Sequence, residues 1–146
     1  MGWQALETQQ PNLAAFGAER FRQSGVAYLA TIRADGSPRV HPVTPIIGQG
    51  RLFVFMEPTS PKGHDLRRDS RYALHCSVSN SSGGSGEFFI FGHAMFIEDS
   101  ATRALAVASA SYAPADRYVL FELDVERASS TTYRDGQPVR QHWKAD

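Results

Sequence analysis

The chain has 146 residues, and its 15 basic and 15 acidic side chains give a formal net charge of zero with neutral histidines. This balance argues against a basic nucleic-acid-binding protein. The single cysteine, Cys76, excludes an intramolecular disulfide or a cysteine-rich zinc site and is typical of a reducing compartment. The apolar runs fall short of the roughly 20 residues that span a bilayer, and residues 1–10 lack a signal-peptide pattern. We therefore expect one soluble cytoplasmic domain over residues 1–146, with no nucleic-acid or membrane partner.

Turn and helix signals divide the chain into short strands and a few short helices. In chain order we predict a helix over about 12–24, strands over 26–33, 39–47 and 51–56, a helix over 60–69, strands over 72–78 and 87–98, a helix over 99–111, a strand over 118–126 and a final hairpin of 131–134 with 139–143. Asp35-Gly36 and Asp135-Gly136 mark tight turns, and Gly25 ends the first helix. Two prolines inside 39–47 indicate an edge, bulge or bend in that strand.

Antiparallel strands joined by hairpins, without alternating βαβ units, indicate a mainly β protein with short helices. Barrel closure removes exposed sheet edges, so we expect a closed or nearly closed barrel over about 26–134 and a C-terminal tail over about 135–146. The chain has neither the Gly-rich turn of a Rossmann fold nor a GxxxxGK[ST] phosphate loop. Both of those nucleotide-binding classes are therefore disfavoured.

Residues 59–68 (TSPKGHDLRR) combine hydroxyl, ammonium and guanidinium groups directly after an apolar strand. Ser60 is a favourable helix N-cap, and Pro61 then occupies the first helical position, where its missing N–H costs nothing. A lysine in the first turn, here Lys62, is mildly unfavourable beside the helix dipole unless an anion is bound. The segment therefore predicts a phosphate-binding site, with Arg67 favoured over Arg68 to reach back to it and a solvated helix face as the alternative for both.

Residues 88–91 (FFIF) place aromatic side chains at successive strand positions. Side chains alternate between the two faces of a strand, so these residues cannot all face the barrel interior. Either a bulge intervenes or both faces of this strand are covered. Coverage of the outer face by a second subunit satisfies the pattern and predicts a homodimer.

Six groups of residues occur in an order and spacing that fit one known family. They are LATI at 29–32 with DGSP at 35–38, RVHPV at 39–43, LFVF at 52–55, SPK at 60–62 with LR at 66–67, RYAL at 71–74 and FGHA at 91–94. Together they resemble the FMN-binding split-barrel proteins related to pyridoxamine 5'-phosphate oxidase. The resemblance implies a six-stranded antiparallel split β-barrel that forms a homodimer, with FMN at the subunit interface.

The resemblance also implies a set of FMN-binding residues. Arg39, Ser60 and Lys62 match the phosphate-binding pattern, and Arg67 follows them on the helix. The positions that match backbone or side-chain contacts of the isoalloxazine ring are Val40, His41, Pro42, Val43, Thr44, Phe55 and Met56. Trp143 matches an aromatic or basic residue near the C-terminus that reaches the partner's flavin. Thr44 departs from the lysine of the true oxidases, and their substrate-recognition residues do not align, so vitamin B6 oxidation is not implied.

Three functions remain open. The first is an FMN-dependent oxidoreductase that passes a hydride or electrons between the flavin and an unidentified small molecule. The second keeps the fold but binds the deazaflavin F420, with Arg67, Arg68 and Arg71 facing its acidic tail. The third is a non-enzymatic flavin or haem binder or sensor, in which His41 or His93 ligates haem. The five histidines show no zinc-site spacing, so we expect no metal site.

Overall fold

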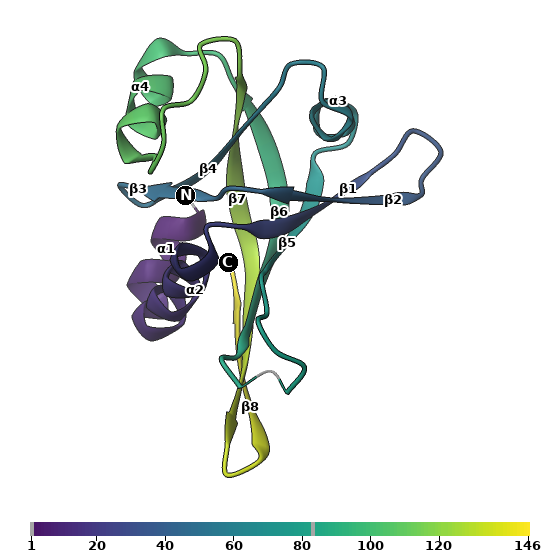
Figure 1. The fold of residues 1–146 in the computed structure, drawn as a ribbon. Helices are drawn as coiled ribbons and strands as arrows, with labels where there is room; N and C mark the ends of the chain where they lie inside the picture. The colour runs from purple at the N-terminus through teal and green to yellow at the C-terminus, as the bar shows by residue number, and fades with distance from the viewer. Residues whose placement is uncertain (1, 83) are drawn as a thin grey trace.

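The computed structural model describes residues 2–82 and 84–146 (Figure 1). Within them the helices are α1 (Gly2–Gln9), α2 (Pro11–Ser24), α3 (Pro61–Arg68) and α4 (Ser100–Ser109). The strands are β1 (Ala27–Ile32), β2 (Pro38–Val43), β3 (Ile46–Gly48), β4 (Arg51–Met56), β5 (Arg71–Cys76), β6 (Glu87–Ile97), β7 (Val119–Arg134) and β8 (Gln137–Lys144). None of these helices is long and apolar enough to cross a membrane.

The strands form one antiparallel sheet in the order β2-β1-β5-β6-β7-β4-β3, with β8 paired to β7 outside this path. Strands β2 and β3 lie at opposite ends of the path, yet only Thr44 and Pro45 connect them. Because this link is so short, the two ends of the sheet lie close together and the sheet is curled into a barrel. The open seam of the barrel runs between β2 and the last residues of β4. Figure 1 shows β1 and β2 crossing over β6 and β7. The predicted mainly β, antiparallel split barrel is confirmed.

The predicted strand over 39–47 is two strands, because the ladder stops at Val43 and resumes at Ile46. Pro45 has no backbone N–H to donate to a ladder, and the chain changes sheet edge at this point. This break, together with β8, gives eight strands within the described residues where the resemblance implied six.

The N-terminal prediction omitted one helix and misplaced the start of the next. Helix α1 precedes the predicted segment and buries Trp3 and Leu6. Helix α2 begins at Pro11, with Gln10 at the N-cap position, because proline is favourable in the first turn, where no N–H bond is lost. Gly25 ends this helix in the left-handed conformation, with φ of 70°, as predicted.

The C-terminal residues form the second strand of the predicted final hairpin, so most of the region expected as a tail belongs to the sheet. Strand β7 runs without interruption from Val119 to Arg134, and β8 returns along it. Asp135 and Gly136 have positive φ angles of 51° and 76°, which confirms the predicted tight turn.

The aromatic run on β6 divides between the two faces of the strand. Phe88 is fully buried and makes edge-to-face contacts with rings of α1 and α2, namely those of Trp3, Phe16 and Phe21. Phe89 and Phe91 lie on the opposite face, half-buried, with ring centroids 6.0 Å apart. The alternation predicted from the sequence is confirmed, and no bulge intervenes within residues 88–91.

Candidate phosphate-binding site

Helix α3 begins directly beyond the end of β4, at the upper end of the barrel in Figure 1. Ser60 has an extended backbone at the N-cap position, and Pro61 is the first helical residue, as predicted. Gly63 is buried, and a Cβ atom there would lie 3.0 Å from Met56 Sδ. The missing side chain thus lets the first turn of α3 approach the end of β4 closely.

The Ser60 hydroxyl does not cap α3, which corrects the expectation for its side chain. Within the described chain it makes no cap hydrogen bond, and instead its Oγ accepts a hydrogen bond of 2.9 Å from Lys62 Nζ. The first N–H groups of α3 therefore lack a side-chain cap from Ser60. Ser60 and Lys62, both assigned to phosphate binding, are adjacent in space.

Lys62 is a partly buried ammonium group without a counter-ion. Among residues 2–82 and 84–146, no carboxylate lies within 4.0 Å of its Nζ. Burial lowers the pKa of Lys62, because removal from water disfavours its charged form. An anion bound beside the ammonium would compensate for this desolvation.

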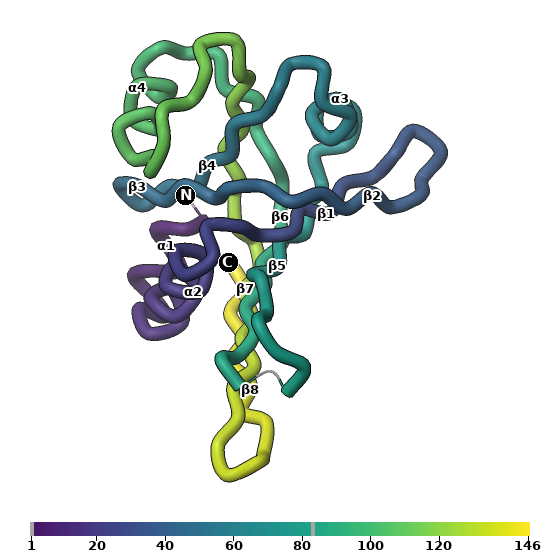
Figure 2. The backbone as a smooth tube through the Cα atoms, viewed as in Figure 1, coloured from purple at the N-terminus to yellow at the C-terminus, as the bar shows by residue number. Residues whose placement is uncertain are grey.

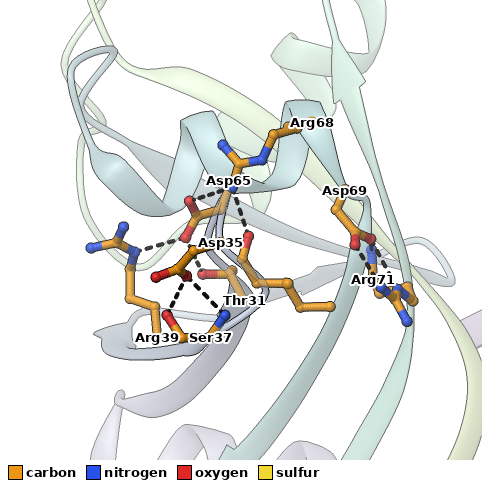
Figure 3. A network of polar contacts seen from close by, with 9 residues as sticks. Thr31, Asp35, Ser37, Arg39, Asp65, Arg68, Asp69 and Arg71 are labelled. Carbon is orange, nitrogen blue, oxygen red and sulfur yellow. Dashed lines mark hydrogen bonds and ion pairs between the residues drawn. The ribbon is translucent and has the colours of Figure 1, made fainter.

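Arg39 extends from β2 toward α3 and pairs with Asp65 (Figure 3). Its Nε lies 2.7 Å from Asp65 Oδ2, and about a fifth of its side chain, 21%, stays exposed. The two Nη groups have no hydrogen-bond partner in the described part of the chain, and Figure 3 shows this end of the guanidinium pointing away from Asp65. Arg39 therefore keeps donors available for a ligand.

Asp65 is the central residue of the polar network, and the sequence interpretation missed it. Its carboxylate is buried and accepts hydrogen bonds from Thr31 Oγ1 at 2.8 Å, from Arg39 Nε and from Arg68 Nη2 at 3.0 Å. Burial disfavours ionisation, but these hydrogen bonds outweigh it and hold the pKa of Asp65 below its usual range. The i,i+3 spacing to Arg68 was a visible signal; the contacts with β1 and β2 were not.

A shallow depression of about 470 Å³ adjoins this network. Its lining residues are Arg33, Ala34, Asp35, Arg39, Pro61, His64, Asp65 and Arg68. Pro61, which stands between Ser60 and Lys62, forms part of the wall. The depression thus brings basic groups from the β1–β2 turn, from β2 and from α3 to one surface.

Arg67 lies outside this network. Its guanidinium stacks over the Phe96 ring, 4.1 Å from the centroid, whereas Arg68 donates to Asp65 and to the Ile32 carbonyl. The geometry favours Arg68 over Arg67 for the phosphate. Arg71 makes a bidentate ion pair with Asp69. All three arginines considered for an F420 tail thus already have a partner.

The residues assigned to the flavin ring lie along the seam of the barrel. Phe55 and Met56 are buried, at 7% and 4% exposure, so their side chains do not line an open surface, and contact with a ring falls to their backbone. On β2, side chains alternate between exposed and less exposed positions, and Val40 is 62% exposed. Within the described chain β2 pairs only with β1, so its other edge presents unpaired backbone groups. The stretch assigned to this edge comprises Val40, His41, Pro42, Val43 and Thr44.

Trp143 is buried in its own chain, at 7% exposure. It belongs to β8, which extends away from α3 in Figure 2, and its Nε1 donates to Gln9 Oε1 at 2.8 Å. Its ring lines a depression of about 600 Å³ on the β6–β8 face. The other lining residues are Phe89, Phe91, Arg127, Ser129, His142 and Lys144. The Trp143 side chain is largely covered by its own chain, so its contact with a flavin in a second subunit stays a prediction.

The fold and this site define a split β-barrel with basic side chains gathered at one end. The sequence matches the family described as pyridoxamine 5'-phosphate oxidase over residues 15–132. The match covers more than half of the chain, and the protein belongs to this family. A search of curated proteins found no match.

Solved structures share the fold at low sequence identity. A haem-binding protein from Mycobacterium smegmatis is 20% identical, with a TM-score of 0.67 over 89% of this chain; this chain spans only 57% of that protein. A NimC/NimA family protein from Clostridium acetobutylicum is 17% identical, with a TM-score of 0.69 over 95% of this chain and 98% of that one. The haem storage protein HutZ from Vibrio cholerae is 16% identical, with a TM-score of 0.57 over 86% and 92%.

Proposed function

We propose that the protein binds FMN, with the flavin phosphate held by Lys62, Ser60 and Arg39. The observation that carries the proposal is the unpaired, partly buried Lys62 ammonium beside the Ser60 hydroxyl. Arg39 adds free Nη donors from the neighbouring strand. Charge-assisted hydrogen bonds from such groups are the strong contacts that a phosphate monoester accepts. This donor set fits a terminal phosphate.

The isoalloxazine ring would then lie along the seam between β2 and the end of β4. Support comes from the unpaired outer edge of β2, whose backbone N–H and C=O groups can bond the polar edge of a flavin. When bound, FMN supplies the redox chemistry, which makes the protein a candidate oxidoreductase for an unidentified small molecule. The chain's own part is to hold the phosphate and to orient the ring by its strand edge. F420 is less favoured, because Arg67 stacks on Phe96 and Arg71 pairs with Asp69, which leaves only Arg68 of the three arginines in the polar network beside the site.

We also propose that the protein forms a homodimer through the outer face of β1, β5 and β6. The strand registers align Val40, Ala30, Ala73 and Phe91 in one row across this face. Val40 is 62% exposed, and the neighbouring Tyr28 is 45% exposed. A contiguous apolar surface of this kind on a sheet is typical of a subunit interface. Such a dimer supplies the second chain from which Trp143 would reach the flavin.

Haem is the second candidate ligand, favoured by the depression on the β6–β8 face. Its aromatic rings flank a surface that also carries Arg127 and Lys144, which suits a planar ligand with carboxylates. His142 Nδ1 lies 3.0 Å from Ser129 Oγ, so Nε2 is the nitrogen of this ring that would ligate the haem iron. His93, considered earlier, has its Nδ1 2.7 Å from Ser70 Oγ and is exposed on β6. A Soret band that His142→Ala abolishes would select haem over FMN.

The FMN proposal is tested by titrating the apoprotein with FMN and with riboflavin, which lacks the phosphate. We expect FMN to bind at least about tenfold more tightly, the equivalent of roughly 1.4 kcal/mol. Inorganic phosphate should compete with FMN and leave riboflavin binding unchanged. Equal affinity for the two flavins would overturn the assignment of the phosphate site.

A further inference from the structure

We propose that Asp65 is a positioning residue that fixes Arg39 and Arg68 in the orientation in which they meet the ligand's phosphate. The inference rests on the proposed FMN site and extends it to a residue that makes no contact with the ligand itself. Asp65 belongs to α3, and its hydrogen-bond donors belong to β1, to β2 and to α3 itself. The carboxylate therefore connects the helix to the strand that carries Arg39.

The hydrogen bonds of Asp65 occupy both of its oxygens. Oδ2 accepts from Thr31 and Arg39, and Oδ1 accepts from Arg68 (Figure 3). A carboxylate held by three donors and 3% exposed has little freedom to rotate. Its partners are in turn restricted, so the two guanidinium groups are arranged before any ligand arrives. Such preorganisation lowers the entropy cost of binding.

The bonding pattern leaves the outer ends of the guanidinium groups available. Arg39 uses Nε, the inner nitrogen, for Asp65. Arg68 uses Nη2 both for Asp65 and for the Ile32 carbonyl. A guanidinium group has five N–H donors in a rigid fork, so each arginine retains donors directed outward. Asp65 thus orients both groups without consuming their capacity to bind an anion.

The negative charge of Asp65 and its positioning role predict opposite changes in FMN affinity when the carboxylate is neutralised. A carboxylate near a phosphate repels it, so its charge alone weakens anion binding. Two cationic groups, Arg39 and Arg68, pair with this single carboxylate, so the cluster remains positive. If Asp65 acted only through its charge, its neutralisation would tighten FMN binding. If it acts by positioning the arginines, neutralisation weakens FMN binding.

The test compares wild-type protein with Asp65→Asn, using FMN and riboflavin as probes. We expect Asp65→Asn to bind FMN at least about tenfold more weakly and riboflavin within twofold of wild type. The matched control is Asp69→Asn, which removes the same charge four residues later, where the carboxylate bonds the side chain and backbone N–H of Arg71 and neither Arg39 nor Arg68. It should leave both affinities within twofold. Tighter or unchanged FMN binding by Asp65→Asn would overturn the proposal.

A second variant, Thr31→Val, covers the case in which Asp65→Asn does not fold. It removes one of the three hydrogen bonds to Asp65 and keeps every charge. We expect FMN affinity to fall by about 2- to 10-fold, less than in Asp65→Asn because both arginines keep their bonds to the carboxylate, and riboflavin affinity to be unchanged. An equal loss for both flavins would assign Thr31 and Asp65 to fold stability and overturn the proposal. Wild-type protein that does not prefer FMN over riboflavin would overturn the phosphate site as well, whereas loss of the Asp65 effect alone leaves that site intact.

Discussion

Replacement of Lys62 by Met isolates the contribution of the ammonium group to the phosphate site. Met preserves much of the apolar stem and removes the charge. The lost contact is a charge-assisted hydrogen bond from a partly buried group, worth about 1.5–3 kcal/mol. At 1.4 kcal/mol per tenfold, this predicts that FMN binds about 10- to 150-fold more weakly. Riboflavin, which has no phosphate, should bind as before.

The same variant has a second, independent consequence for the apoprotein. The Lys62 ammonium is partly desolvated without a counter-ion, so its removal costs the fold little. We expect the free energy of unfolding of ligand-free Lys62→Met to stay within about 1 kcal/mol of wild type, since one hydrogen bond to Ser60 is lost. Isothermal titration calorimetry measures the affinities, and urea unfolding measures the stability.

The control for this variant is Arg22→Met, which removes one positive charge from an exposed position on α2. It should change neither the affinity for FMN nor that for riboflavin. If Lys62→Met keeps the wild-type ratio of the two flavin affinities, Lys62 does not contact the phosphate. If it weakens both flavins and lowers stability by several kcal/mol, the lysine has a structural role. Either result refutes the reasoning.

The remaining predictions concern assembly, core packing and pH. Phe91→Asp should convert the proposed dimer to a monomer in sedimentation equilibrium. Tyr133→Asp, a change at an exposed aromatic on the β7–β8 hairpin arm, should leave the proposed dimer intact. Phe88→Ala should lower the free energy of unfolding by about 3–5 kcal/mol in urea titrations, because it leaves a cavity among three packed rings; a loss under 1 kcal/mol would contradict this packing. The pKa of Asp65 lies below its ordinary value, so its stabilising contribution is present above about pH 4 and lost as pH falls through the folded pKa. The free energies of unfolding of wild type and Asp65→Asn should therefore differ at pH 7, and the difference should shrink as pH falls below about 4 toward the folded pKa. A difference that grows toward low pH would contradict the assigned sign.

Local signals were sufficient to predict most of the barrel. Asp35-Gly36 and Asp135-Gly136 identified two hairpin turns. The helix predicted over 99–111 is α4, and Asp99 caps it by accepting from the Thr102 N–H. The alternation of the β6 side chains between the two faces of the strand was also predictable, because neighbouring residues in a strand face opposite sides. These features depend on interactions between near neighbours in the chain, which a sequence shows directly.

Features that depend on distant contacts were missed. Helix α1 has a weak apolar pattern, and it forms because Trp3 and Leu6 bury themselves against the barrel. Ser60 has the sequence of a capping residue, but Lys62 binds its hydroxyl instead. Asp65 resembles an ordinary helical partner of Arg68, and only the fold brings Arg39 to it. The candidate site was thus predictable in its composition but not in its internal bonding.

The central claim, that this family member carries FMN, is tested most directly by identifying the chromophore of the purified protein. Absorbance spectroscopy should show the two visible-region bands of an oxidised flavin, and mass spectrometry of the released small molecule should give the mass of FMN. Lys62→Met should be purified with less of it. A Soret band, a deazaflavin spectrum, or a flavin without its phosphate would contradict the account.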